Sequence, residues 1–257
     1  MIELLESRVL GAVRWIDAVT QAPVTLPLTV SGPGLRFTRN LSGLTVITHA
    51  AGLEALVRTF DLSTLPAGDA VPVGDRVLIA DVTDPGGTYL PRRFSFNLPR
   101  DPAPVPTSPD VARPPHSLFT PFDVELLPAP AARLPAGCAE VRVLVQDSAG
   151  RPLPHALIRI VATASGAILG CGQADARGEA LAAIPGLRHF APGATEDEVV
   201  SVETEARLEL IHPPAGATRV DWTLLRAAPV AAGDTDPSPL RLKPGARISR
   251  RYPFGDG

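Results

Sequence analysis

Apolar and polar residues alternate along most of the second half of the chain. From Val141 to Val145 every second residue is valine, with Arg142 and Leu144 between them, and this period of two is typical of a strand with one buried face. The alternation, or a short apolar run, returns at 156–162, 168–172 and 180–184. Turn residues separate these runs, at Asp147–Gly150, Ser165–Gly166 and Asp175–Gly178. Short strands with turns at this spacing predict an antiparallel β-sandwich.

The first half of the chain has a similar organisation. Strand-like runs occur at 13–17, 28–30, 35–38, 44–48, 77–82, 94–98 and 122–126, with turn residues at 31–34, 40–43 and 84–87. The stretch 99–117 has too many prolines to pair inside a sheet, so we expect an extended excursion with polyproline character there. We therefore predict an all-β protein of two tandem antiparallel β-sandwich domains, at 8–130 and 138–254, with a short, stiff linker at Pro128–Gly137.

Three further elements are expected after residue 187. Regular alternation from Val200 to Leu210 predicts a single strand whose other face, which includes Glu205, Arg207 and Glu209, is wet. The stretch Arg219–Arg226 predicts a short helix that carries Trp222 and Leu225. The last strand is expected at 246–254.

Composition agrees with this organisation and bears on which classes of partner the protein binds. The chain has 257 residues, 45% hydrophobic and 20% charged, so each half is long enough to bury its own core. Its 29 prolines and 22 glycines suit an all-β chain with many turns. The net charge is −3 and the basic residues are scattered, so we expect no nucleic-acid partner.

The N-terminal residues bear on localisation. Glu3 and Glu6 stand where a signal peptide would be basic, and no apolar run is long enough to cross a bilayer. We therefore expect no membrane insertion, and synthesis and assembly in the cytoplasm, with release as part of an extracellular particle left open. Cys138 and Cys171 lie in apolar, strand-like surroundings, so two buried thiols are expected in preference to a disulfide.

Residues that carry chemistry are sparse. The five histidines, at 49, 116, 155, 189 and 212, have no second ligand at the spacing of a metal site. The stretch from Val30 to Gly34 is expected to be a turn, because no helix follows as a nucleophile elbow would require. Asp234 and Asp236 are better explained by an Asx turn before Pro237 than by calcium. We predict no catalytic residue, no cofactor and no metal site.

Charged and aromatic clusters leave two alternatives open. The pairs Arg92-Arg93 and Arg250-Arg251 either contact an acidic partner or are solvated surface. The acidic run Glu196–Glu198 either supplies such a partner or is also solvated surface. Trp15 and Trp222 have apolar neighbours, so we expect core anchors and not sugar-stacking platforms.

Two resemblances to known families add to this interpretation. The pattern V-x-V-x-V-x-D-x-x-G-x-P-L-P-x-A-x-I-x-I, followed by A-D-A-x-G-E-A, resembles carboxypeptidase-regulatory-like, or transthyretin-like, β-sandwich domains. The matching positions are Asp147, Gly150, Pro152, Ala156, Asp175 and Gly178. This resemblance implies an immunoglobulin- or transthyretin-like sandwich in the second half, and it implies no zinc or catalytic residue.

The first half resembles accessory proteins of phage-tail-like contractile injection particles. The matching segments are Gly11–Thr20, Leu28–Arg36, Asn40–Leu44, His49–Glu54 and Tyr89–Arg93. This resemblance implies a non-enzymatic structural or adaptor component whose partners are protein subunits of sheath, tube, cap or baseplate type. The alternatives are a carbohydrate- or peptide-binding module, which 5% aromatic residues disfavour, and an accessory domain of a separately encoded enzyme.

Overall fold

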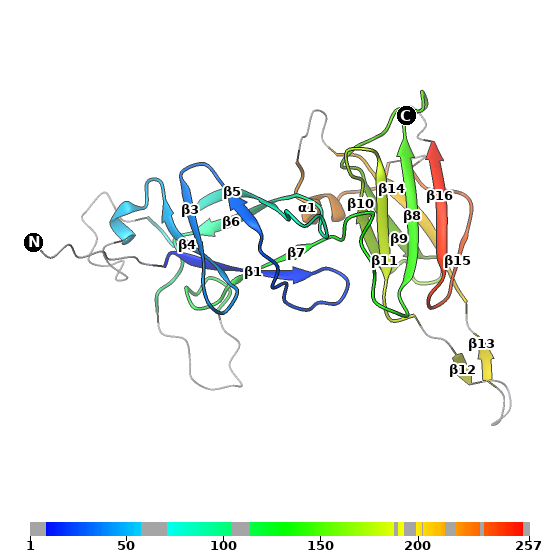
Figure 1. The fold of residues 1–257 in the computed structure, drawn as a ribbon, viewed down its shortest axis with the longest axis horizontal. Coiled ribbons are helices and arrows are strands. Elements are labelled where there is room, and N and C mark those ends of the chain that lie inside the picture. The colour runs from blue at the N-terminus through cyan, green and yellow to red at the C-terminus, as the bar shows by residue number, and fades with distance from the viewer. Residues whose placement is uncertain are drawn as a thin grey trace, which may run out of the picture. The chain divides into compact units, whose positions relative to one another are not determined.

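The computed structural model describes residues 9–57, 71–103, 114–187, 190–192, 199–201, 203–213, 219–231 and 234–253. The chain divides into two compact units. The first contains the described parts of Met1–Asp17, Gln21–Pro85 and Arg93–Leu126, and the second contains those of Ala18–Thr20, Gly86–Arg92 and Leu127–Gly257. Nearly all the regular secondary structure described in the two units is β-strand (Figure 1), so the prediction of an all-β protein is confirmed.

The first unit is built from two sheets. One has the strand order β3-β4-β1-β7 and the other the order β2-β5-β6. Their bounds are β1 Gly11–Asp17, β2 Thr29–Ser31, β3 Leu35–Arg39, β4 Thr45–Ala50, β5 Arg76–Thr83, β6 Arg92–Leu98 and β7 Phe122–Leu126, with a 3-10 helix at Glu54–Val57. These agree with the strand-like runs of the sequence to within about two residues.

A chain of aromatic contacts lies in the core of the first unit. The ring centroids of Trp15 and Phe94 are 5.4 Å apart with an edge-to-face geometry, and Phe96 lies 5.7 Å from Phe94 and 5.4 Å from Phe122. The indole nitrogen of Trp15 donates to Oγ1 of Thr45 at 2.9 Å, which satisfies its polar group in the core. Trp15 is therefore the core anchor that the sequence predicted.

The second unit is a sandwich of two sheets. One has the order β10-β9-β14-β15 and the other the order β11-β8-β16, and β12 and β13 form a separate ribbon. Their bounds are β8 Ala139–Gln146, β9 Leu157–Ala162, β10 Ile168–Gln173, β11 Glu179–Ile184, β12 Phe190–Pro192, β13 Val199–Ser201, β14 Thr204–Ile211, β15 Leu240–Leu242 and β16 Arg247–Pro253. Alternate residues of β8, from Ala139 to Val145, face a core shared with β9 and β14.

The two units share a pairing that the sequence did not predict. In the first unit, β1 lies antiparallel to β4 and parallel to β7. In the second, β8 lies antiparallel to β11 and parallel to β16. A parallel pair needs a long connection, and the first and last strands of each unit are far enough apart in sequence to provide one.

Two glycines close one side of the second sandwich. A Cβ at Gly170 would overlap the carbonyl oxygen of Ala183, and a Cβ at Gly172 would overlap that of Leu181. The backbone of β10, at the edge of one sheet, therefore lies directly against β11, at the edge of the other. Glycine is required here because of this close approach of two backbones.

A second apolar cluster covers the outer face of the β9–β14 sheet. The short helix α1 (Trp222–Arg226) contributes Trp222 and Leu225, which pack with Leu157 and Ile211. Asp221 caps the helix by accepting from the backbone N–H of Thr223 at 3.1 Å, as expected for an N-cap residue. The predicted helix and the core position of Trp222 are both confirmed.

The prediction of one strand from Val200 to Leu210 was wrong. The stretch forms two strands, because β13 pairs with β12 whereas β14 pairs with β9 and β15. The predicted wet face also fails at Glu209, which is 6% exposed. Ion pairs with Arg159 and Arg207 compensate for that burial, and period-two alternation carries no information about such partners.

The stretch predicted to be a linker belongs to the second unit. Leu127, Pro128, Pro130 and Ala132 are buried, and the guanidinium of Arg142 donates to the carbonyl oxygen of Pro130. Proline rings and alanine methyl groups contribute to a core in proportion to the apolar area they bury, so a segment need not be a strand to pack against one. The division into domains at 8–130 and 138–254 stays a prediction.

We expect Gly172→Ala to destabilise the protein, because the new Cβ collides with backbone and not with a movable side chain. Its cost in the free energy of unfolding should be about 2–3 kcal/mol, as for other overpacked sites. Cys171→Ala, one residue earlier in β10, is the matched control and should cost less than about 1 kcal/mol. Urea denaturation measures both; equal costs for the two variants would contradict the close approach of β10 and β11.

The half-buried His155 predicts a pH dependence of stability. Burial lowers the pKa of its imidazole below the ordinary value, so the unfolded chain takes up the proton first as the pH falls. Stability should therefore decrease as the pH falls through about 6.5. His155→Asn suits the left-handed backbone there, with φ 63°, and should remove part of this decrease. Thermal unfolding across that pH range tests this, and identical slopes for both proteins would contradict it.

Candidate functional site

The histidines are dispersed over both units. His49 is on β4, His116 lies near the end of the proline-rich stretch, His155 precedes β9 and His212 follows β14; His189 lies outside the described residues. Within the described ranges, no group of three or more His, Cys, Asp or Glu residues is placed to hold a metal ion. No helix in the same ranges is long and apolar enough to cross a membrane.

The other candidate positions have structural surroundings. Ser31 ends β2, and the turn after it leads into β3, so it is no nucleophile elbow. Oδ1 of Asp236 accepts from the backbone N–H of Ser238 at 2.8 Å, which is the predicted Asx turn. Neither cysteine is part of a disulfide; Cys138 is buried, whereas Cys171, predicted to be buried, is only half-buried.

One ionic cluster of the second unit is centred on Arg159 and Glu209. Its Nε and a terminal nitrogen donate to Oε2 of Glu209 at 3.1 and 2.8 Å. Its other terminal nitrogen donates to the carbonyl oxygens of Arg226 and Ala228, at 3.0 and 3.3 Å. Arg159 therefore ties the end of α1 to the sheet, and its donors are used for structure.

A second cluster holds the beginning of α1. Arg92 donates to Asp221 at 3.1 Å and to Thr223, and its guanidinium carbon lies 5.1 Å from the ring centroid of Trp222. Arg93 forms an ion pair with Asp81 at 3.0 Å. The hypothesis that Arg92 contacts an acidic partner from the surface was wrong, because the side chain is buried against α1. Its acidic partner comes from the same chain, about 130 positions away in sequence.

Arg100, in the first unit, is buried, and no carboxylate of the described residues forms an ion pair with it. It is 7% exposed and donates to the carbonyl oxygens of Ser117 and Thr120, at 3.2 and 2.7 Å. Its guanidinium carbon lies 4.2 Å from the ring centroid of Phe122. Burial lowers the pKa of Arg100 from its ordinary value. The arginine thus holds together the residues that follow the proline-rich stretch, by bonds and a cation–π contact.

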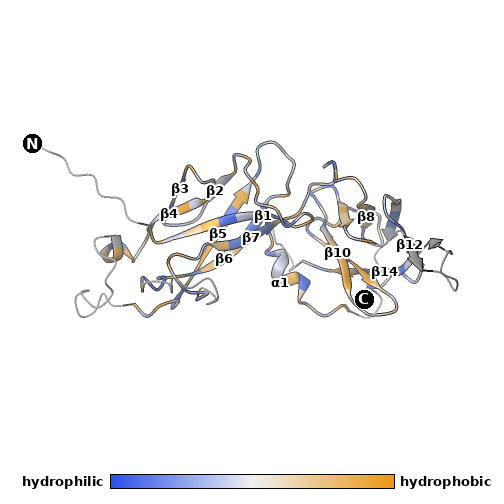
Figure 2. Ribbon diagram, turned by 90° about the horizontal axis from the view of Figure 1, so that it is seen from below, coloured by the Kyte–Doolittle hydropathy of each residue, from blue (hydrophilic) through white to orange (hydrophobic). Residues whose placement is uncertain are grey.

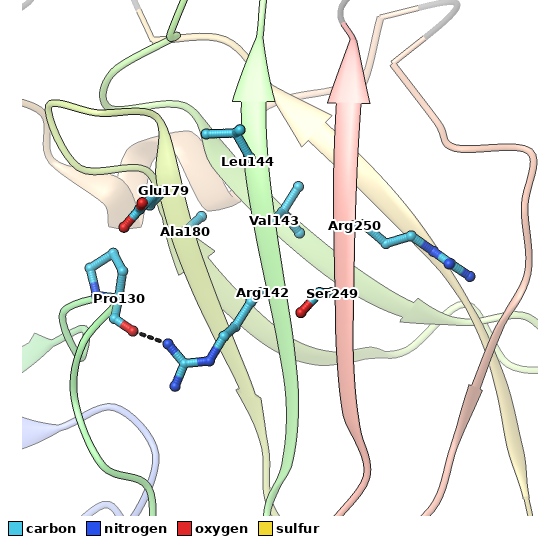
Figure 3. A pocket seen from close by; sticks show the side chains of 8 residues that line it. All are labelled: Pro130, Arg142, Val143, Leu144, Glu179, Ala180, Ser249 and Arg250. Carbon is cyan, nitrogen blue, oxygen red and sulfur yellow. Dashed lines mark hydrogen bonds between the residues drawn. The ribbon is translucent and has the colours of Figure 1, made fainter.

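A surface hollow lies over the β11-β8-β16 sheet (Figure 3). It has a volume of about 300 Å³, and its lining includes Pro130, Arg142, Glu179, Ser249 and Arg250. Arg142 and Ser249 stand opposite each other on β8 and β16. The hollow is shallow and partly apolar, and the chain provides no nucleophile with an adjacent base in its lining. It suits a contact surface better than an active site.

Sequence reasoning found part of this surface. The pair Arg250-Arg251 had been singled out, and both side chains are exposed on β16. Arg142, Glu179 and Ser249 were missed, because the signal that unites them is register between strands. That register can be read only when β8, β11 and β16 are known to be neighbours. The acidic run Glu196–Glu198 lies outside the described residues.

No protein-family model matches the chain, and no curated protein matches its sequence. Three solved structures with similarity are the Bacillus anthracis TIE protein, a streptococcal ancillary pilin and the minor pilin of Streptococcus agalactiae. Their identities are 10%, 10% and 8%, with TM-scores of 0.27, 0.29 and 0.27. The similarity covers 96%, 86% and 85% of this chain, and 34%, 50% and 66% of theirs. At these TM-scores it supports no conclusion about function.

We expect Arg159→Met to lower the free energy of unfolding by about 3 kcal/mol, because it leaves Glu209 buried with one arginine fewer. The double variant Arg159→Met/Glu209→Leu should recover part of this loss, since it removes both charges. Arg14→Met is the matched control; it breaks an ion pair with Asp123 whose side chains are 44% and 50% exposed, and should cost less than about 1 kcal/mol. Equal costs at Arg14 and Arg159, measured by chemical denaturation, would contradict a structural role for the buried cluster.

Proposed function

We propose that this chain is a non-enzymatic structural or adaptor component of a multi-subunit assembly. The observation that supports the proposal is a contrast between charged residues that bond within the chain and charged residues that lie exposed on an edge strand. Arg92, Arg100 and Glu209 are buried, the side chain of Arg159 is 12% exposed, and all four bond to their own chain. In contrast, β16 is a seven-residue edge strand with exposed arginines. Exposed strand edges are sites at which another chain adds by main-chain hydrogen bonds.

We place the assembly among phage-tail-like contractile injection particles. The support is the resemblance of the first half, whose matching segments include all of β1 and the β2-β3 connection. The partner would then be a repeated sheath, tube, cap or baseplate subunit. Synthesis and assembly in the cytoplasm belong to the same proposal, as does release within a particle.

The resemblance of the second half to carboxypeptidase-regulatory-like domains concerns fold. Asp147 accepts from the backbone N–H of Arg151 at 2.7 Å, and Asp175 accepts from that of Arg177 at 2.8 Å. Gly150 and Gly178 adopt φ values of 79° and 76°, which favour glycine. The quoted positions thus shape turns, which supports the resemblance and assigns no chemistry to it.

A carbohydrate-binding module is the second candidate, and the aromatic residues disfavour it. Trp15 and Trp222 are each 2% exposed, so neither is available to stack on a sugar. Among the described residues, Phe119 is an exposed aromatic side chain, at 55%, and a single ring makes a small platform. Peptide binding, or docking to a separately encoded enzyme, would use the same strand edges as assembly.

The proposal is tested by purifying the tagged full-length chain from the cells that encode it. We expect structural subunits of an assembly to be recovered with it, identified by mass spectrometry, and tubular particles in negative-stain images. The matched control is the destabilised Gly172→Ala variant, which should recover less of the same subunits. Recovery of the chain alone at low salt would refute the assembly, and recovery with one enzyme in fixed ratio would favour the accessory domain.

A further inference from the structure

We propose that the open edge of β16 binds an extended acidic segment of a partner subunit as an added strand. This inference names the docking surface and the partner chemistry of the proposed function, and it rests on that function for the source of the segment. The edge itself is defined by hydrogen-bond geometry.

The ladder between β8 and β16 determines which backbone groups face the edge. The N–H of Glu140 donates to the carbonyl oxygen of Ala246 at 2.8 Å, and Glu140 stands opposite Arg247. In a parallel ladder, bonding residues alternate, so the even-numbered residues of β16 bond to β8. The N–H and C=O groups of Arg247, Ser249 and Arg251 therefore face away from β8.

A second hydrogen bond leads to the same assignment of which residues of β8 bond to which neighbouring strand. The N–H of Val145 donates to the carbonyl oxygen of Gly178 at 2.8 Å, so the odd-numbered residues of β8 face β11. Its even-numbered residues are thus the ones left for β16. In the described part of the chain, the strand order β11-β8-β16 ends at β16.

The other edges of this sandwich are less suitable. β10 and β11 lie against each other through Gly170 and Gly172, so neither has room for another strand on that side. β15 is an edge of only three residues, whereas β16 has seven. Three of these seven residues, Arg247, Ser249 and Arg251, have both an N–H and a C=O that face outward, enough to hold a short extended segment.

The charge on this edge selects the chemistry of the partner. Residues 240–253 contain Arg241, Lys243, Arg247, Arg250 and Arg251 and no acidic residue, in a chain with a net charge of −3. The side chain of Arg247 is 82% exposed, and its Nε lies 3.6 Å from Oε1 of Glu140. Arg250 has no acidic partner within the described residues, and Figure 3 shows it extending from β16 on the side away from β8. Side chains alternate between the two faces of a strand, so Arg247 and Arg251 share one face, whereas Arg250 lies on the face of Ile248 and Tyr252. An incoming segment with carboxylates at alternate positions would place them beside Arg247 and Arg251.

The same charges disfavour a second copy of the chain. Two β16 strands placed edge to edge would bring arginines opposite arginines, and like charges directly opposite each other are destabilising. Charged side chains on an edge strand are a common protection against self-association. The edge therefore discriminates between partners, because it repels the β16 strand of a second copy and attracts an acidic strand.

A direct test uses a probe independent of the cellular partner. The probe is a peptide as long as β16 that alternates glutamate and valine, and its control alternates lysine and valine. We expect the acidic peptide to slow amide hydrogen exchange at least tenfold at Arg247, Ser249 and Arg251, with little change at Ile248 and Arg250, which already bond to β8. Equal protection by both peptides, or none by either, would overturn the proposal.

Variants then link the edge to assembly. Ser249→Pro removes an N–H at the open edge without touching the β8 ladder, and should lower recovery of the partner subunits at least tenfold. Ser249→Val keeps the N–H and should recover them as the unmodified chain does. Arg250→Glu/Arg251→Glu should abolish recovery, whereas Arg36→Glu/Arg133→Glu makes the same change of net charge elsewhere and should not.

These outcomes separate the two proposals. Full recovery of partners by a folded Ser249→Pro variant would overturn the edge while leaving the assembly intact. Protection by the acidic peptide without any recovered partner would support the edge and refute the assembly. A dimer of the free chain in solution that Ser249→Pro dissociates would assign the edge to a second copy and overturn the acidic partner.

Discussion

The close approach of β10 to β11 is the constraint on which the second unit depends. Gly170 and Gly172 allow the backbone of one sheet edge to lie against carbonyl oxygens of the other. That contact closes the sandwich on one side, and the parallel strand β16 then forms the end of the β11-β8-β16 sheet on the other. One side is thereby protected from further pairing, and the other retains backbone groups that face outward.

Buried charge is the second constraint, and it explains why the chain carries little obvious site chemistry. Arg159 and Glu209 are desolvated together and joined to the carbonyl oxygens after α1. Arg92 holds the N-cap of the same helix through Asp221. A five-residue helix is too short to be stable by itself. Arg159 therefore attaches its end to β9, and Arg92 holds its beginning. Charges used in this way are unavailable for catalysis or for an external ligand.

The exposed charges have a different role. Arg250 and the neighbouring basic residues of β16 lie where a strand can be added, so they act on the choice of partner and contribute little to folding. The hollow beside Arg142 lies on the same sheet. Figure 2 shows hydrophobic residues in orange on strands of both units, as expected for strands with a buried face. Stability and recognition are thus separated by burial: the arginines that hold α1 bond to buried groups of the unit, whereas those of β16 have exposed side chains.

Most of the local structure could be predicted from the sequence. Alternating valines in β8, the Asp147 and Asp175 turns and the buried Trp222 depend on neighbours in sequence, and the structure confirms them. What the sequence could not show depends on which strands become neighbours. The parallel pairing of β16 with β8, the burial of Glu209 and the exposure of alternate backbone groups on β16 are of this kind. The pattern along a strand defines its two faces, but only the tertiary structure decides which strand lies at an edge.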